Sequence, residues 1–331
     1  MCIKGRYFFS DSSDVPAPRP FQKPWLSLAS QVALLASRGL IVNDPAAAEG
    51  FLSHVNYYRF SGYCLAFETG RHRFRADATF EAIRRSYLFD LSLRDLLSEA
   101  LEVVEVDVRT AMAHRLGEQY GAFGHVSASN FYSLPVRTQV VAASKASQFQ
   151  HPLWLKRLRG EAARSKELFV KHFGNNYIEF PDLPIWIVTE VMTFGSLSRL
   201  FEGLKKPDKK AIAGRYGVQP HILESWLHHL VYIRNLCAHH ARIWDRIWSI
   251  SPMIPAGKSW EIEGRAGKGH LASTLYILSK LLRRCATFEP FATEWKLRVE
   301  ELLGVPPEIP DSLFHMGLND PLSGNALWKS L

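Results

Sequence analysis

The stretch from Thr79 to Gly117, TFEAIRRSYLFDLSLRDLLSEALEVVEVDVRTAMAHRLG, contains no proline, and no glycine before its last residue. Apolar residues recur in it at steps of three and four, which is the period of a helix with one buried face. This pattern predicts one long helix, or two helices meeting near Asp90 to Ser92. The buried face would comprise Leu93, Leu97, Ala100, Leu101, Val104, Val108, Ala111 and Met112.

Helical patterns continue on both sides of this stretch. Ser27 and Gly39 bracket the first helix as cap and stop, and Asp44 followed by Pro45 begins the second. A basic stretch ending at Gly174 is expected to be helical, and Asp182 is expected to cap a helix over 185–204. A short helix is expected to begin at 207, and further helices are expected over 221–250, 271–287 and 290–303. Convincing strands are absent, although Phe67 to Phe80 is compatible with a short hairpin.

The chain is therefore expected to be all-α. Residues 1–24 carry four prolines and predict a flexible arm, residues 25–303 a single helical body, and residues 304–331 a C-terminal tail. Of the 331 residues 47% are hydrophobic and 22% charged, which is typical of a folded globular protein. The four cysteines form no paired motif, and no apolar run reaches membrane-spanning length, so we expect a cytoplasmic protein outside the membrane.

The net charge is +8, which favours a polyanionic partner. Much of the excess lies between Lys145 and Lys171, where seven basic residues oppose Glu161 and Glu167. An ordinary solvated helix face is the simpler interpretation of this stretch, and contact with phosphates is the alternative. The residues that would make such contacts are Lys156, Arg157, Arg159 and Arg164.

Residues 226–242, WLHHLVYIRNLCAHHAR, place histidines, arginines and an asparagine in an otherwise apolar helix. Such polar groups favour a cleft or specific partners over a plain core. At about 100° per residue one polar stripe would comprise Glu224, His228, Asn235, His239, Arg242 and Arg246.

Arg234 and His239 have the Arg-x4-His spacing of metal-independent ribonucleases of the HEPN class. RNA cleavage needs a base for the 2′-hydroxyl proton, an acid for the leaving oxygen and a cation for the phosphorane, which histidine and arginine can supply. The same spacing occurs at Arg109 to His114 and Arg265 to His270, so spacing alone does not identify the site. Arg234 and His239 would also lie about 140° apart on an ideal helix.

Two other interpretations of the histidines stay open. A zinc site from His228, His229, Cys237, His239 and His240 is not favoured, because helical spacing gives no closed tetrahedral set. Histidines of the core or of a helix cap, with Arg234 in a structural ion pair, are the second alternative.

Several blocks together resemble the bacterial abortive-infection family called Abi-like, or AbiD/AbiF-like. The most specific are LSHVNYYRFSGYCLAF at 52–67 and IRNLCAHHAR at 233–242. The others are Lys23-Pro24 with 31–40, Phe89-Asp90 with 94–97, residues 105–114 and residues 184–200. The resemblance covers about residues 23–252.

This resemblance implies a HEPN-like helical bundle elaborated by additional N- and C-terminal helices. It implies an RNA endonuclease that needs no metal or other cofactor and acts in phage defence or as a growth-arresting toxin. Arg234, Asn235 and His239 match the catalytic motif, with Glu105, Arg109 and His114 as an accompanying cluster in which Glu105 and Arg109 can pair. Further RNA contacts are expected from His228, His240, Arg242 and Arg246.

The aromatic block at 56–63 suits base stacking, although core packing is the simpler role for Asn56, Tyr57, Tyr58, Arg59 and Tyr63. A homodimer is expected to complete the cleft, with Arg109 and His114 as the rival, and an antitoxin or a noncoding RNA would be a natural partner. Trp226, Leu230, Trp244 and Trp248 would offer a dimer surface, or else pack in the core. The alternative function is a catalytically silent module that binds RNA or a partner.

Overall fold

The computed structural model describes residues 20, 22–132, 149–255, 269–285, 289–318, 322 and 328. The predicted arm at 1–24 falls largely outside this part, as do Lys145, Arg265 and most of the expected loop at 252–270. The described chain is all-α apart from one antiparallel hairpin, β1 (Glu68–Gly70) and β2 (Arg73–Phe74), within the stretch compatible with a hairpin.

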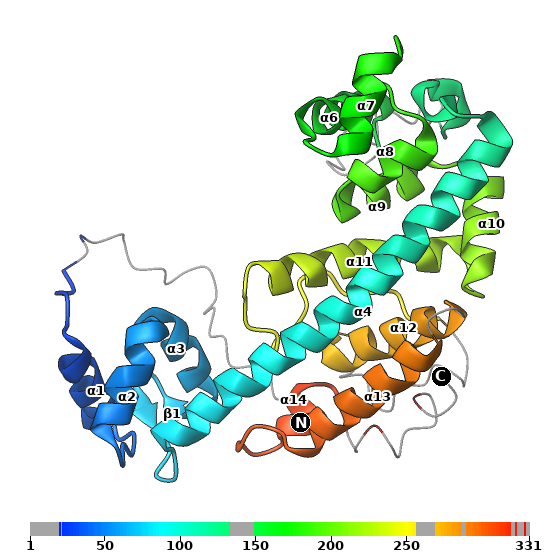
Figure 1. The fold of residues 1–331 in the computed structure, drawn as a ribbon. Coiled ribbons are helices and arrows are strands. Elements are labelled where there is room, and N and C mark those ends of the chain that lie inside the picture. Colours follow the sequence, from blue (N-terminus) through cyan, green and yellow to red (C-terminus); the bar gives the residue numbers. More distant parts are fainter. Residues whose placement is uncertain are drawn as a thin grey trace.

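One helix, α4 (Phe80–Tyr120), runs through the whole body and settles the choice between one helix and two (Figure 1). Thr79 caps its start by accepting from the Ala82 N–H, and Gly121 follows its end with a φ of 74°. The predicted apolar face is buried, with Ala111 partly so. Most of the other helices pack directly on this one.

The N-terminal elements lie at one end of α4 (Figure 1). They are α1 (Leu28–Ser37), α2 (Pro45–His54), α3 (Tyr57–Cys64) and the short turn Leu65–Phe67, followed by the hairpin. The side chain of Ser27 accepts from the Ser30 N–H and that of Asp44 from the Ala47 N–H, so both predicted helix starts are confirmed.

The other end of α4 carries the turns Gly124–Val126 and Ala128–Asn130 and four helices (Figure 1). These helices are α6 (His151–Arg164), α7 (Leu168–Asn176), α8 (Ile185–Val191) and α9 (Phe194–Gly203). The prediction of one helix over 185–204 is wrong. Thr193 accepts from the Ser196 N–H and begins a separate helix, so its capping oxygen outweighs the apolar pattern. Asp182 is not a cap either, because its carboxylate binds Arg159.

The remaining helices surround the middle of α4. They are α10 (Lys206–Arg215), α11 (Pro220–Ala238), α12 (Leu271–Arg284), α13 (Glu289–Gly304) and α14 (Ser312–His315). Helix α11 crosses α4 on one side, whereas α12 and α13 pack on it from the other (Figure 1). Trp295 on α13 donates to the Leu96 carbonyl at 2.8 Å. Beyond Gly304, the side chains of Leu322 and Trp328 are buried in the same core.

Among the described residues, no helix is long and apolar enough to cross a membrane. The four residues considered for a dimer surface, Trp226, Leu230, Trp244 and Trp248, are buried within the monomer. That suggestion is therefore wrong, and their simpler role in the core is confirmed.

Two buried histidines make stability depend on pH. Burial lowers the pKa of both His125 and His229 to about 4. The neutral ring of His229 fits its partners, since Nδ1 lies 2.6 Å from the Ile250 carbonyl and Nε2 lies 2.9 Å from the Thr274 hydroxyl. The unfolded chain binds protons near pH 6.5, whereas the folded one does not until about pH 4, so stability falls as the pH drops through this window.

We expect each of these histidines to reduce the free energy of unfolding by about 2 kcal/mol between pH 7 and pH 5. Urea unfolding at the two pH values measures this. His229→Gln, whose side chain does not titrate, should shrink the difference by its share. An undiminished pH dependence in that variant would contradict the assignment.

Candidate functional site

Helix α11 ends at Ala238, and the prediction that it continues to about Ile250 is wrong. His240 has a left-handed φ of 53°. Its N–H donates to the Cys237 carbonyl at 2.9 Å, and the Ala241 N–H donates to the Leu236 carbonyl at 2.9 Å. These two bonds form a Schellman motif, in which the left-handed position is usually glycine. A histidine therefore ends this helix where the sequence offers no glycine.

The chain after α11 is attached to α3 by two arginines. Arg59 on α3 donates through Nη1 to the His240 carbonyl. In return, Arg242 donates through Nη1 to the Gly62 carbonyl at 2.8 Å. The two sequence blocks that carry the resemblance, 180 positions apart, thus meet in space and fix each other's backbone.

Below this junction lies a buried polar network centred on Asp90, whose side chain is fully buried. Its carboxylate pairs with Arg94 and accepts from the Tyr63 hydroxyl at 2.7 Å. It also accepts from the backbone N–H groups of Ile243 and Trp244, at 3.0 and 2.7 Å. Burial, followed by the adjacent Asp90 carboxylate, raises the pKa of the Tyr63 hydroxyl, so this group stays protonated and donates. Asp90 therefore ties α3, α4 and the chain after α11 together.

A cleft of about 750 Å³ opens between α4 and the end of α11. Arg234 and His240 line it from the α11 side, and Glu105 and Arg109 from α4. Charged groups that sequence reasoning missed are also in its wall, namely Arg94, Asp95, Glu102 and Glu190. For Asp95 and Glu102, the signal in the sequence is the series of acidic residues along the exposed side of the long helix.

The side chain of Arg109 is held by fixed partners. It pairs with Glu105, as expected from their spacing, and donates through Nη1 to the carbonyls of Thr189 and Glu190 at 2.9 and 2.8 Å. These carbonyls belong to the last turn of α8, where backbone acceptors lack helical partners. Arg109 therefore stabilises the end of α8 while it forms part of the cleft wall.

His114 is not brought to this cleft. It lines a separate depression of about 480 Å³ with Arg115, Glu118 and Arg215. Five residues along a helix correspond to a rotation of about 500°, which turns His114 some 140° away from Arg109. The structure therefore brings Glu105 and Arg109 together with Arg234 and separates His114 from them.

Arg234, Asn235 and His239 all have exposed side chains at the C-terminal end of α11. Arg234 lies one turn before the last helical residue, Ala238, whereas His239 is the residue that follows the helix. The ψ of 11° at His239 redirects only the chain that follows it, so the ideal-helix separation of about 140° between the Arg234 and His239 side chains still applies. The carbonyl of Asn235 accepts from the His239 N–H at 3.0 Å.

The other expected RNA contacts are dispersed. His228 is exposed two turns before Arg234 on α11. Arg242 and Arg246 are half-buried, and Arg246 donates to the Arg242 carbonyl at 3.2 Å, so neither continues a helical stripe. Arg159 forms a two-bond pair with Asp182, both at 2.7 Å. The side chains of Lys156, Arg157 and Arg164 are exposed on α6, at the opposite end of α4 from α3 (Figure 1).

The aromatic block around α3 divides between core and surface. Phe60 and Tyr63 are buried, and Asn56 caps α3 by accepting from the Tyr58 N–H at 2.7 Å. The ring of Tyr58, in contrast, is 86% exposed. Within the described part of the chain, no three His, Cys, Asp or Glu side chains are grouped so as to hold a metal ion. His229 in particular is engaged by Ile250 and Thr274.

The comparison with protein families matches a range that contains both sequence blocks, 52–67 and 233–242. The family model described as Abi-like protein matches residues 50–245, more than half of the chain. The chain belongs to the Abi-like family. The matched range begins before α3 and ends just after the backbone N–H groups that bind Asp90, so it encloses both arginine links and the charged cleft of this Abi-like protein. No curated protein and no solved structure matches the chain.

Proposed function

We propose that this Abi-like protein is an RNA endonuclease that uses no metal and acts in phage defence, by abortive infection or as a growth-arresting toxin. The observation that carries the proposal is that Arg234, Asn235 and His239 are all exposed towards the C-terminal end of α11, where Arg234 lines a charged cleft. Family membership supports the defence role, because it places the chain among Abi-like proteins.

The proposed chemistry uses only groups of the chain. A neutral imidazole accepts the 2′-hydroxyl proton as the 2′-oxygen attacks phosphorus, and a protonated one donates to the 5′-oxygen as its bond to phosphorus breaks. Arg234 stabilises the extra negative charge of the phosphorane, and Asn235 orients a phosphate oxygen or the imidazole. The products are a 2′,3′-cyclic phosphate and a 5′-hydroxyl, and no water is consumed in this step.

We expect cleavage to continue in EDTA, because the histidine mechanism requires no Lewis acid. A short unstructured RNA labelled at one end should be cut in 5 mM EDTA, on the order of the rate with Mg²⁺, and yield 5′-hydroxyl ends. Such a substrate avoids the effects of Mg²⁺ on RNA folding. Complete loss of cutting in EDTA, restored by one divalent ion, would refute the metal-independent mechanism, and binding without any turnover would favour the silent module.

We further propose that a second copy of the chain completes the cleft, since one helix cannot present Arg234 and His239 to the same phosphate when their side chains lie about 140° apart. The cleft wall offers exposed apolar side chains beside its charges, with Leu91 40% and Val106 49% exposed. A twofold contact there would bring two α11 ends together.

Mixing inactive Arg234→Ala protein with inactive His239→Ala protein should then restore part of the activity through hybrid clefts. With random pairing, about half of the dimers are hybrids, and each carries one intact set of groups. A monomer by sedimentation that remains fully active would contradict the shared cleft. Severe loss in His114→Ala without rescue on mixing would favour the rival arrangement.

A further inference from the structure

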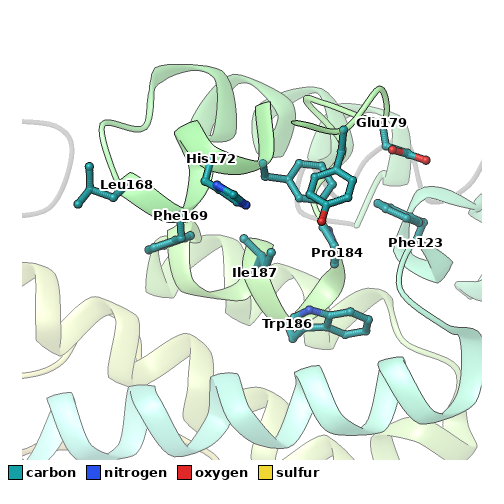
Figure 2. Close-up of a pocket in the computed structure, with 10 residues that line it drawn as sticks. Phe123, Leu168, Phe169, His172, Glu179, Pro184, Trp186 and Ile187 are labelled. Atoms are coloured by element: carbon teal, nitrogen blue, oxygen red, sulfur yellow. The ribbon is translucent and has the colours of Figure 1, made fainter. Parts of the chain in front are cut away.

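A second pocket, of about 700 Å³, lies between α7 and α8 at the end of the molecule that carries the basic helices (Figure 2). Phe169 and His172 on α7 face Ile187 and Trp186 on α8 across the opening, and Phe123 closes one side (Figure 2). Its size is within the range of small-ligand pockets. None of these residues belongs to the cleft beside Arg234.

The lining consists mainly of rings. Six of the ten lining residues carry an aromatic or imidazole ring, namely Phe123, Phe169, His172, Phe173, Tyr177 and Trp186. Trp186 is 53% and Tyr177 52% exposed, so their faces are open to a flat ligand. Tyr177 is stacked on the buried Phe173 with ring centroids 4.6 Å apart, which holds it in place before any ligand arrives.

The surrounding helices are cationic. From His151 to Asn176, six lysines and arginines oppose two glutamates. Of these, Arg159 is neutralised by Asp182, whereas Lys166 and Lys171 are exposed on either side of the first turn of α7, which lines the pocket. Phosphates attached to a ligand in the pocket would therefore lie in a positive field.

We propose that this pocket binds unpaired bases of single-stranded RNA, with the basic residues of α6 and α7 contacting its backbone. Single-stranded nucleic acids are typically bound by aromatic rings that stack on the bases and by nearby cations that contact the phosphates. The exposed Glu179 at the rim offers a carboxylate to the amino groups of a base. This inference rests on the proposed function, since it describes how the substrate is held away from the cleavage site.

The test measures binding rather than cleavage, with full-length His239→Ala protein as the background. Two labelled 12-nucleotide RNAs serve as probes, one with all its bases and one abasic with the same phosphates. The protein should prefer the RNA with bases. Trp186→Ala and Phe169→Ala should each weaken its binding about five- to 150-fold and leave the abasic RNA unaffected.

Lys171→Ala should weaken both RNAs alike, because it acts on phosphates only. Ile178→Ala is the matched control, as Ile178 is 98% exposed beside the pocket without lining it. Both ring truncations remove partly exposed side chains, so the variants should still fold. Fluorescence quenching of RNA that contains 2-aminopurine, by protein with both rings intact, gives a second measure of stacking.

Equal binding of the two RNAs, or base preference that survives both ring variants, would overturn the proposal. If Trp186→Ala instead abolished self-association and left RNA binding unchanged, the pocket would be an interface between copies. If binding depended on the bases but the wild-type protein, which carries His239, did not cleave RNA, the result would support the role of this pocket and refute the cleavage proposal. Cleavage without base-dependent binding would support the cleavage proposal and refute the role of this pocket.

Discussion

His239→Ala and Arg234→Ala are each expected to slow RNA cleavage by about 10²- to 10⁴-fold. In the proposed mechanism the first removes a group that transfers a proton, and the second removes the cation that stabilises the phosphorane. Both side chains are exposed at the end of α11, so their truncation should leave the melting temperature nearly unchanged. Single-turnover cleavage of a short RNA, with thermal unfolding alongside, measures both effects.

His221→Ala is a suitable control, because His221 is exposed in the first turn of the same helix, far from its C-terminal end. It should cut at the wild-type rate. Arg234→Lys should recover part of the activity, since it keeps the charge and loses the two-pronged geometry. Cutting at the wild-type rate by either alanine variant would refute the assigned role, and a melting temperature lowered by several degrees would indicate a structural role instead.

Asp90→Ala is expected to have the largest effect on stability, about 3–5 kcal/mol of the free energy of unfolding. It leaves the guanidinium of Arg94 buried without its carboxylate. It also removes the acceptor of Tyr63 and of two backbone N–H groups. Urea unfolding at pH 7 measures the loss.

Asp95→Ala provides the comparison, because Asp95 is exposed on the same helix. Its effect should stay within about 0.5 kcal/mol. The double variant Asp90→Leu with Arg94→Met should recover much of the stability, since it removes both buried charges together. A loss below about 1 kcal/mol in Asp90→Ala would contradict the central role of this carboxylate.

The helix starts were predictable because each follows from one local contact. Ser27, Asp44 and Thr79 cap their helices with side-chain oxygens, as their positions before apolar periodic runs indicate. Thr193 makes the same contact but lies inside an apolar stretch, where its oxygen carries no distinguishing pattern. The end of α11 was unpredictable for a related reason, because a histidine occupies the left-handed position that sequence rules assign to glycine.

The arrangement of the candidate site could not be predicted from the sequence. The choice of Arg234, Asn235 and His239 rests on the family resemblance and stays a prediction, whereas the Glu105 and Arg109 pair, which helix geometry predicts, is present. The links from Arg59 and Arg242 join positions that no local pattern connects. The spacing of Asp90 and Arg94, four apart among apolar neighbours, is compatible with a buried ion pair. The backbone N–H groups of Ile243 and Trp244, which Asp90 also binds, lie more than 150 positions later, where no local pattern indicates the contact.

The paired links between α3 and the end of α11 also determine at which stage of synthesis this part of the molecule can assemble. Arg59 and His240 are separated by 181 positions, and Asp90 and Trp244 by 154. A chain emerging from the ribosome at about 5–20 residues per second exposes α3 many seconds before its partners. Until residue 244 has emerged, the motif has neither its helix end nor its anchors. Under the proposed function, a growing chain should therefore not cleave RNA until this segment has emerged, and fragments that end before residue 244 should be inactive.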